Sequence, residues 1–343
     1  MTSREIARLA GVSVSTVSIV LNGKPGVSEE TRTRVMDILE QNGFSLNMRN
    51  PVALQGGVIR FCKIAKHGQI VNDRHNAFIS DYTDGIIEEA KLHGLSVEVA
   101  TFNGSSLLSV SELIRVSHGL TGCIILATEL SQGDIDIFDG IGIPFVFLDA
   151  MYEFSPHDFV TMDNMKMTFD MVRHLYELGH RKIGMLYNEG GSNFGQRKTA
   201  FIRALASLGL SFREDWMLRI GSTHETAQSD MYRQIQGKKD LPTAFFASND
   251  MIAAGAIAAL QSLHYKVPED ISVGGFDDIP VASFIDPPLT TISVPKFDIG
   301  RLAVSVLLDK IKKRGVYLSQ KSVLAGKLLV RKSTSPVLQG QRI

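Results

Sequence analysis

Four polar residues are spaced so that they could bind one small ligand. Asp149 ends the apolar run FVFLD, Asn249 ends AFFASN and Asp277 ends ISVGGFD, while Arg197 is expected to open the helix after KIGMLYN. Such runs are typical of strands in parallel sheets, which bind ligands at the carboxyl ends of their strands. One guanidinium donor, two carboxylate acceptors and one amide suit a neutral hydroxylated ligand such as a sugar, and equally a purine with mixed edges.

A purely structural explanation competes with ligand binding for the carboxylates. Asp149 and Asp277 could do no more than accept hydrogen bonds from backbone amides at the strand ends. Asp250 is expected to cap the helix that follows it, and Asp278 to serve a turn. Neither of these last two is therefore predicted as a ligand residue.

A second group of short polar residues lies near the N-terminus, on two predicted helices joined at Gly11. Thr2 and Glu5 form a capping box for the first helix, and Ser13 caps the second, with Thr16 three residues later. A third helix is predicted from Glu29 to Asn42, with Ser28 as its cap. The apolar residues expected to face inward are Ile6, Leu9 and Ala10 on the first helix, Val17, Val20 and Leu21 on the second, and Val35, Ile38 and Leu39 on the third.

The outer face of the second helix carries short side chains and no Glu or Lys. It consists of Val14, Ser15, Thr16, Ser18, Ile19 and Asn22. Any two amphipathic helices around a glycine look somewhat like this pair, but an ordinary solvated helix would carry long charged residues there. A short, hydroxyl-rich face without carboxylates can approach phosphates and base edges closely, so the segment is predicted to bind DNA as a helix-turn-helix.

Composition sets limits on the class of protein. The 343 residues are too many for one core, 44% of them are hydrophobic, and the formal net charge is zero. Zero charge counts mildly against a nucleic-acid binder, although hydroxyls and helix N-termini can supply phosphate contacts. Cys62 and Cys123 each lie in an apolar run, as expected of buried free thiols in a reducing cytoplasm. No export signal and no membrane span is expected, so the protein is predicted to be cytoplasmic.

The rest of the chain alternates predicted strands and helices. Residues 44–57 lose periodicity and are expected to be a linker in which only Val52 to Gln55 could be helical. From Val58 a strand–helix series runs twice, which predicts two doubly wound parallel-sheet subdomains facing each other across a cleft.

Three long motifs in this order resemble the LacI/GalR family of bacterial repressors. They are EIARLAGVSVSTVSIVLNG with its continuation KPGVSEETRTRV, then HLYELGHRKIGML with FFASNDMIAAGAIAAL, and VPEDISVGGFDDIPVASFIDPPLTTISVP. The resemblance implies an all-α three-helix head over residues 1–46, a hinge over 47–57, and an effector-binding and dimerisation domain over 58–343 shaped like periplasmic sugar-binding proteins. Its lobes are expected to comprise 58–160 plus 291–318, and 161–290 plus 319–336. The implied assembly is a homodimer, with a tetramer as the alternative.

The resemblance also assigns roles to matching positions. Base contacts fall on Val14, Ser15 and Ile19, phosphate contacts on Ser13, Thr16, Ser18, Asn22, Ser28 and Thr31, and a minor-groove wedge on Leu54 beside Ala53. The effector contacts are Asp149, Arg197, Asn249 and Asp277, with Phe78 and Thr223 as weaker candidates.

Two departures from the family pattern matter. Ile19 stands where the family usually has an arginine that would bond guanine, so a half-site richer in A·T is expected at that contact. The hinge has MRNPVALQGG, with a proline and a shorter helix, and a flexible tether without DNA contact is an equal alternative.

The predicted partners are double-stranded operator DNA and a small effector, with a carbohydrate favoured over a purine. A transport solute-binding protein would need a signal peptide and would lack the helix-turn-helix. A nucleotide-dependent enzyme would need a GxGxxG turn, a P-loop or a Ser-His-Asp set, and the sequence shows none. No enzyme activity, cofactor or metal is expected.

Overall fold

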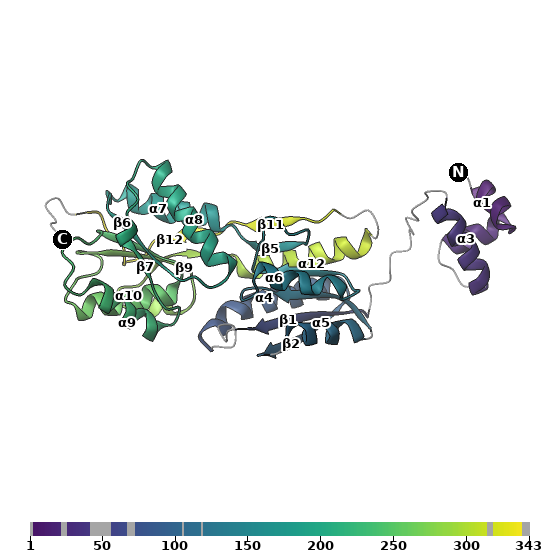
Figure 1. Cartoon of the computed structure of the whole chain (residues 1–343), viewed down its shortest axis with the longest axis horizontal. Coiled ribbons are helices and arrows are strands. Elements are labelled where there is room, and N and C mark those ends of the chain that lie inside the picture. Colours follow the sequence, from purple (N-terminus) through teal and green to yellow (C-terminus); the bar gives the residue numbers. More distant parts are fainter. Residues whose placement is uncertain are drawn as a thin grey trace.

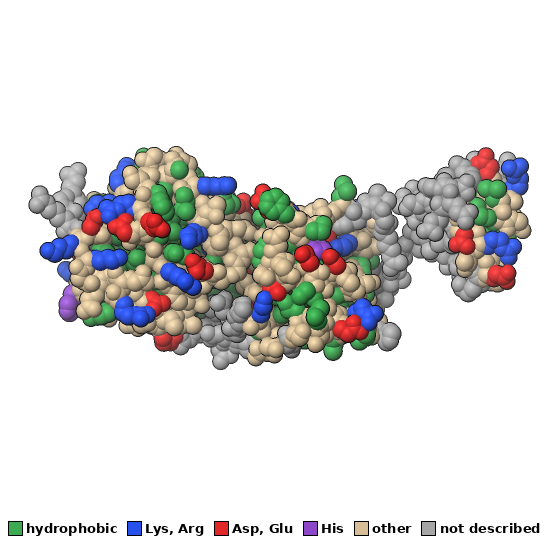
Figure 2. Space-filling view, viewed as in Figure 1, with side chains coloured by type: hydrophobic (Ala, Val, Ile, Leu, Met, Phe, Trp, Pro, Cys, Tyr) green, Lys and Arg blue, Asp and Glu red, His purple; other side chains and the backbone are tan. Residues whose placement is uncertain are grey.

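The computed structural model describes residues 3–21, 26–41, 56–66, 73–104, 106–117, 119–313 and 318–337 (Figure 1). Several predicted features lie outside these ranges: the Thr2 cap, Asn22, and the hinge residues Ala53 and Leu54. On the face seen in Figure 2, side chains of both charges are interspersed over the two lobes. Among the described residues, no helix is long and apolar enough to cross a membrane.

The N-terminal head consists of three helices, α1 (Ser3–Ala10), α2 (Val14–Leu21) and α3 (Glu29–Gln41). Their shared core is formed by Ile6, Ala7, Ala10, Val17, Val20 and Val35. Gly11 joins α1 to α2 with a φ of +65°, a conformation that glycine adopts without strain. The prediction of Leu9 as an inner residue is wrong, because its side chain is 51% exposed and Ala7 takes its place. At about 100° per residue, a stripe centred on Ala10 includes residues 6 and 7 and leaves residue 9 at its margin.

The first lobe is built on a parallel six-stranded sheet with the order β11-β5-β4-β3-β1-β2. The strands are β1 (Val58–Ala65), β2 (Ser96–Asn103), β3 (Leu120–Leu126), β4 (Phe145–Leu148), β5 (Phe159–Met162) and β11 (Lys321–Leu324). Helices α4 (Asp73–Leu92) and α12 (Lys296–Lys312) pack on one face, through Tyr82 and Ile299 among others. The other face is covered by α5 (Leu107–Val116), α6 (Gln132–Ile135) and the 3-10 helix η1 (Asp136–Gly140).

The second lobe has its own six-stranded sheet, with the order β12-β10-β9-β8-β6-β7. Its strands are β6 (Ile183–Tyr187), β7 (Met217–Arg219), β8 (Ala244–Ala247), β9 (Ser272–Asp277), β10 (Thr290–Ser293) and β12 (Lys327–Leu329). Helices α7 (Asn164–Glu177) and α8 (Gly191–Ser207) cover one face, and α9 (His224–Ile235) and α10 (Asp250–Ser262) cover the other. The short elements η2 (Glu214–Trp216) and α11 (Val281–Phe284) complete the lobe.

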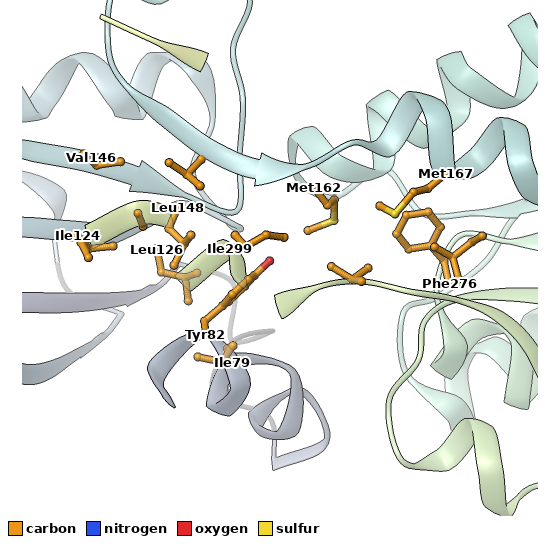
Figure 3. Packing of buried hydrophobic residues seen from close by; sticks show 14 of the residues in the cluster. Ile79, Tyr82, Ile124, Leu126, Val146, Leu148, Met162, Met167, Phe276 and Ile299 are labelled. Carbon is orange, nitrogen blue, oxygen red and sulfur yellow. The ribbon is translucent and has the colours of Figure 1, made fainter. Parts of the chain in front are cut away.

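The two predicted doubly wound subdomains are therefore confirmed, with one exception: the edge strand β12 is antiparallel to β10. A continuous hydrophobic cluster joins the lobes, because Met162, Met167 and Phe276 pack between the first-lobe residues Tyr82 and Ile299 and the core of the second lobe (Figure 3).

The strand pairing places the crossings between lobes a few residues after the expected divisions near 160, 290 and 318. β5, through Met162, pairs with β4 and β11 of the first sheet, and β10, through Ser293, pairs with β9 of the second. The chain thus crosses after residues 162, 293 and 324. A strand run carries no mark of the sheet that it will join, so composition could not place these points.

Candidate ligand cavity and DNA-binding face

The hydroxyls of the head cap its helices, as predicted. The Ser13 Oγ accepts a 3.0 Å hydrogen bond from the Thr16 amide and lies 2.7 Å and 2.8 Å from the hydroxyls of Ser15 and Thr16. The Ser28 Oγ accepts from the Thr31 amide at 3.3 Å and donates to the Thr31 hydroxyl at 2.9 Å. These caps fix where α2 and α3 begin.

The outer face of α2 is available for contact. Val14 is 44% exposed, Ser15 and Ser18 are exposed, and Ile19 is half-buried, whereas Val17 and Val20 are buried. The helix has the sequence VSTVSIVL, so no carboxylate or ammonium stands on it. Short side chains let a helix lie close to the groove floor and backbone of DNA.

A cavity that is partly open to solvent lies between the lobes, and the centre of a water molecule can occupy about 70 Å³ of it. Its walls come from the carboxyl ends of strands in both sheets and from the helices that follow them. Five of the six predicted ligand residues line it, and Thr223 does not. The lining residues are Phe78, Ile79, Thr128 and Asp149 from the first lobe, and Gly190, Asn193, Phe194, Arg197, Asn249 and Asp277 from the second.

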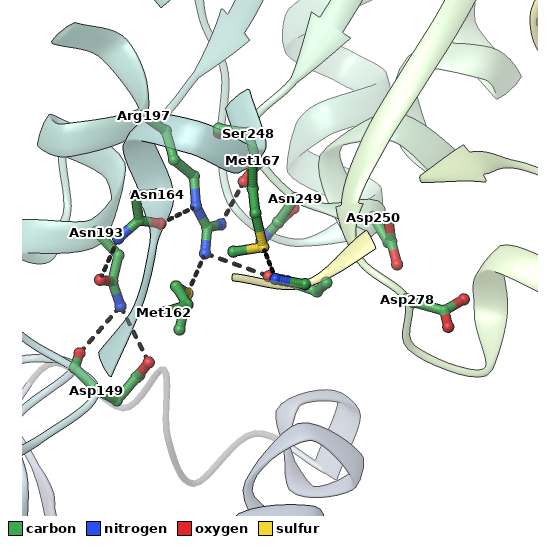
Figure 4. A network of polar contacts seen from close by, with 12 residues as sticks. Asp149, Met162, Asn164, Met167, Asn193, Arg197, Ser248, Asn249, Asp250 and Asp278 are labelled. Atoms are coloured by element: carbon green, nitrogen blue, oxygen red, sulfur yellow. Dashed lines mark hydrogen bonds and ion pairs between the residues drawn. The ribbon is translucent and has the colours of Figure 1, made fainter. Parts of the chain in front are cut away.

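Arg197 is buried and its donors are already engaged by the protein (Figure 4). Its Nε donates to Asn164 Oδ1 at 2.9 Å and its Nη1 donates to the Ser248 carbonyl at 2.6 Å. Its Nη2 donates to Met162 Sδ at 3.1 Å, and the guanidinium lies 3.7 Å from the ring centroid of Phe276. Because α8 begins at Gly191, Arg197 lies in the second turn of the helix and does not open it, contrary to the prediction.

Asp149 holds the first-lobe side of the cavity. Its Oδ1 accepts from the Tyr82 hydroxyl at 2.9 Å and from Asn193 Nδ2 at 3.1 Å, and its Oδ2 accepts from the Thr128 hydroxyl at 2.5 Å. Burial raises the pKa of Asp149 to about 6, against the lowering effect of the hydrogen bonds from Thr128 and Tyr82. The contact with Asn193 of α8 is a direct bond between the lobes.

Asp277 differs from Asp149 because its carboxylate is incompletely bonded. Its Oδ1 forms an ion pair with Arg197 Nη2 at 3.3 Å, but this buried oxygen has no hydrogen-bond partner among the described residues. Burial raises the pKa of Asp277, although the positive charge of Arg197 acts to lower it. An unpartnered buried acceptor on a cavity wall is a position where a ligand donor would be stabilised.

The predicted capping role at the start of α10 belongs to a different residue. Asn249, not Asp250, caps the helix, because its Oδ1 accepts a 2.8 Å hydrogen bond from the Ile252 amide. Asp250 is fully buried and accepts from the Thr291 hydroxyl at 2.5 Å and the Ile279 amide at 2.9 Å. Burial and the negative charge of Asp277 raise the pKa of Asp250 well above its usual range. The Asn249 amide nitrogen stays available at the cavity wall.

Thr223 is a helix cap. Its hydroxyl accepts a 3.2 Å hydrogen bond from the Thr226 amide at the start of α9, and it does not line the cavity. The family resemblance made Thr223 a weaker candidate, but its hydroxyl caps α9. Asp278 does stand in a turn, as expected, and accepts from Arg331 Nη2 at 2.7 Å.

Five lining residues were not predicted: Ile79, Thr128, Gly190, Asn193 and Phe194. Thr128 ends the predicted strand GCIILAT, so the strand-end rule could have found it. Asn193 and Phe194 were missed because the predicted helix began at Gln196, whereas α8 begins five residues earlier. Within the described ranges, no group of three or more His, Cys, Asp or Glu side chains is arranged to hold a metal ion.

Comparison with known proteins gives matches over the whole chain. Residues 2–47 match the family model for bacterial regulatory proteins of the lacI family, and residues 172–334 match that for a periplasmic binding protein-like domain.

Two curated relatives and one solved structure span nearly the same length. The ribose operon repressor of Haemophilus influenzae is 30% identical over 91% of this chain and 92% of its own. The HTH-type transcriptional repressor PurR of the same species is 29% identical over 98% and 99%. The structure of the lac repressor dimer bound to operator and the anti-inducer ONPF has a TM-score of 0.69 at 25% identity, covering 98% of this chain and 99% of that one.

Proposed function

The chain belongs to the LacI family of bacterial regulatory proteins, and from this membership we propose that it is an operator-binding repressor controlled by a neutral polyhydroxy ligand in the interlobe cavity. The observation that carries the proposal is the buried Asp277 Oδ1, which stands without a hydrogen-bond partner among the described residues on the wall of that cavity.

Donor and acceptor chemistry favours a neutral, donor-rich ligand. On the cavity wall two carboxylates, of Asp149 and Asp277, stand against the single guanidinium of Arg197. A phosphorylated ligand would meet repulsion there. A sugar hydroxyl can donate to Asp277 and accept from the Asn249 amide, while its carbon–hydrogen faces lie on the phenyl rings of Phe78 and Phe194.

A purine base fits this donor pattern less well. An arginine that recognises a purine edge in a bidentate manner needs two free donors on its guanidinium. Here Arg197 already donates to Asn164, Ser248 and Met162. The relatives include both a ribose operon repressor and PurR, so the carbohydrate proposal depends on the chemistry of the cavity.

On the DNA side, we propose that Val14, Ser15 and Ile19 contact base edges and that Ser13, Thr16, Ser18, Asn22, Ser28 and Thr31 contact phosphates. Their exposed or half-exposed placement, where the structure describes it, supports these roles. Asn22 and the proposed wedge Leu54 lie outside the described residues. A homodimer would present two such heads to half-sites about one helical turn apart.

Ligand and operator are coupled through closure of the lobes. Direct bonds already join them across the cavity: Asn193 Nδ2 donates to the Asp149 carbonyl at 3.0 Å, and Gln196 Nε2 donates to the Met151 carbonyl at 3.2 Å. A ligand changes operator affinity only by binding one arrangement of the lobes better than the other. We place this regulator in the cytoplasm, where its operator is.

Thermal unfolding of the full chain with three classes of probe tests the ligand class. Neutral sugars, starting with D-ribose, are expected to raise the Tm in a concentration-dependent manner, whereas D-ribose 5-phosphate and hypoxanthine are not. The Asp277→Asn variant should lose the sugar response. A Tm raised by hypoxanthine and by none of the sugars would overturn the carbohydrate assignment, and a sugar response retained in Asp277→Asn would overturn the site.

A further inference from the structure

Two consecutive residues at the edge of the cavity have backbone conformations that side chains rarely adopt. Asp277 has a φ of +113° and Asp278 a φ of +52°. Residues other than glycine persist in such conformations only where surrounding contacts hold them. The turn matters to the cavity, because it directs the Asp277 carboxylate toward the ligand space.

One ammonium group holds both carbonyls of this turn. Lys296 Nζ donates to the Asp277 carbonyl at 2.8 Å and lies 3.3 Å from the Asp278 carbonyl, which it also bonds. Lys296 is only 7% exposed, so these bonds form largely away from water. Arg331 anchors the Asp278 side chain but contributes no bond to the Asp277 carbonyl.

Lys296 belongs to the opposite lobe from the turn it holds. It is the first residue of α12, which packs on α4 and the first sheet, while Asp277 ends β9 of the second. On its own lobe the ammonium lies 5.1 Å from the ring centroid of Phe78 and 3.7 Å from Asp81 Oδ2, both on α4. A single charged group therefore contacts one cavity wall from each lobe.

We propose that Lys296 is a positioning residue that keeps the lobes in register: it holds the strained Asp277–Asp278 turn and the Phe78 ring in place, and thereby fixes the closed form of the empty cavity. When the lobes separate, the ammonium must leave the two carbonyls or leave Phe78 and Asp81. Lys296 makes all of these contacts only when the lobes are together. Its contacts therefore shift the equilibrium between closed and separated lobes toward the closed arrangement. The importance of this role for regulation rests on the proposed function, but the contacts themselves do not.

The test measures lobe distance in the full chain without DNA or sugar. Spin labels at Ser109→Cys on α5 and Ser229→Cys on α9 report on the two lobes, since both serines are exposed and the native Cys62 and Cys123 are buried. Lys296→Met preserves the length of the side chain and removes its charge. We expect a longer, broader distance distribution than in the parent, and recovery toward the parent in Lys296→Arg. The control is Lys312→Met, an exposed lysine on the same helix, which should leave the distribution unchanged.

Hydrogen exchange reports on the turn itself. The Ile279 amide directly follows the turn and donates to Asp250 Oδ2. Without the Lys296 bonds the turn should open more often, so in Lys296→Met this amide is expected to exchange at least about tenfold faster. A hydrogen bond from a charged donor typically contributes stability equivalent to that factor or more. Should Lys296→Met not fold, Asp81→Asn removes only the half-exposed partner on α4 and is expected to shift the lobe distance in the same direction.

An unchanged lobe distance in Lys296→Met, or in Asp81→Asn where that variant stands in, overturns the inference, whatever the exchange rate. An equal change in Lys312→Met overturns it as well, because the effect would then come from the charge of α12 and not from these contacts. Neither readout involves a sugar or an operator. Failure here would therefore leave the proposed ligand and DNA roles standing, and their failure would leave this result intact.

Discussion

The recognition face of the head and the ligand cavity use polar groups in opposite ways. On α2 the hydroxyls of Ser13, Ser15 and Thr16 are exposed or half-exposed and bonded only to neighbours within three residues. In the cavity, Asp149 and Arg197 are charged and buried, and their hydrogen bonds join residues far apart in the chain, as from Asp149 to Tyr82, 67 positions away.

This difference shows where each site is specified. The head face needs only a short helix with the correct caps, so its parts act nearly independently and lose little when one is changed. The cavity forms only where the carboxyl ends of the two sheets meet, and most of its polar side chains are hydrogen-bonded or ion-paired to one another. Substitutions in the cavity are therefore expected to cost more than those in the head, and the predictions below test that ranking.

The largest loss is expected from Arg197→Met. The change removes the bonds to Asn164, Ser248 and Met162 and leaves Asp277 without its counter-charge. Breaking a buried ion pair from one side typically costs about 3–5 kcal/mol in the free energy of unfolding. Urea unfolding followed by the fluorescence of Trp216, the only tryptophan, measures it in the second lobe. The control Arg203→Met, at an exposed position of α8, should stay within about 0.5 kcal/mol; equal losses in both variants would contradict the account.

In the head, Ile19→Arg should change specificity more than stability. An aliphatic side chain can contact a thymine methyl, whereas an arginine can bond guanine, with a discrimination of about 1–3 kcal/mol. Operators selected from a random library by the parent chain should be A·T at this contact, and those selected by the variant should have guanine there. A dominant guanine requirement of the parent would show that Ile19 does not read this position.

Asp149→Asn should remove the pH dependence that the Asp149 carboxyl gives to stability. The folded pKa of about 6 lies above the ordinary value of about 3.9, so the folded state binds more protons and stability falls as pH rises from about 4 to 6. The free energy of unfolding of the variant should therefore gain about 1–3 kcal/mol on that of the parent between about pH 4 and pH 7. This gain is added to a pH-independent cost, because both carboxylate oxygens accept hydrogen bonds and the Asn amide nitrogen cannot.

The measurement is the difference between the unfolding free energies of the two proteins across that range. Burial lowers the pKa of His180 to about 4, so protonation of this histidine in the unfolded chain lowers the free energy of unfolding as pH falls. This contribution is the same in both proteins and cancels in the difference. A difference that does not vary with pH would mean that Asp149 is ionised in the folded protein as it is in the unfolded chain.

The smallest effect is expected at Ser13. Ser13→Ala removes the cap bond to the Thr16 amide and should cost about 1 kcal/mol in the stability of the head. Ser13→Asp keeps a capping oxygen and should retain that stability, but it places a negative charge at the proposed phosphate contact and should weaken operator binding. If both variants bind the selected operator as the parent does, Ser13 is only a cap.

The same contrast explains how far the sequence could predict each region. The caps at Ser13 and Ser28 and the corner at Gly11 depend on neighbours within a few residues, and all three were predicted correctly. Leu9 was misplaced because the inner stripe of an eight-residue helix is set by the helices it meets, and its own spacing allows two choices.

In the cavity, the rule that ligands lie at strand ends found Asp149, Asn249 and Asp277 without knowledge of their partners. The rule also covers Thr128, which was overlooked, whereas Thr223 came from the family resemblance and does not line the cavity. The crossings after β5, β10 and β11 were expected a few residues too early, because strand pairing over long separations is decided by packing that no local pattern records.

The proposed regulation depends on one coupling, between ligand binding in the interlobe cavity and operator binding by the head. An operator selected by the full chain is titrated with and without a saturating neutral sugar that raises the Tm, for the parent and for Asp277→Asn. Coupling in such regulators is typically 1–3 kcal/mol, so the sugar should change the operator Kd of the parent by about 5- to 150-fold and leave that of Asp277→Asn unchanged. A parent Kd that the sugar does not change, or an equal change in both proteins, would contradict the account.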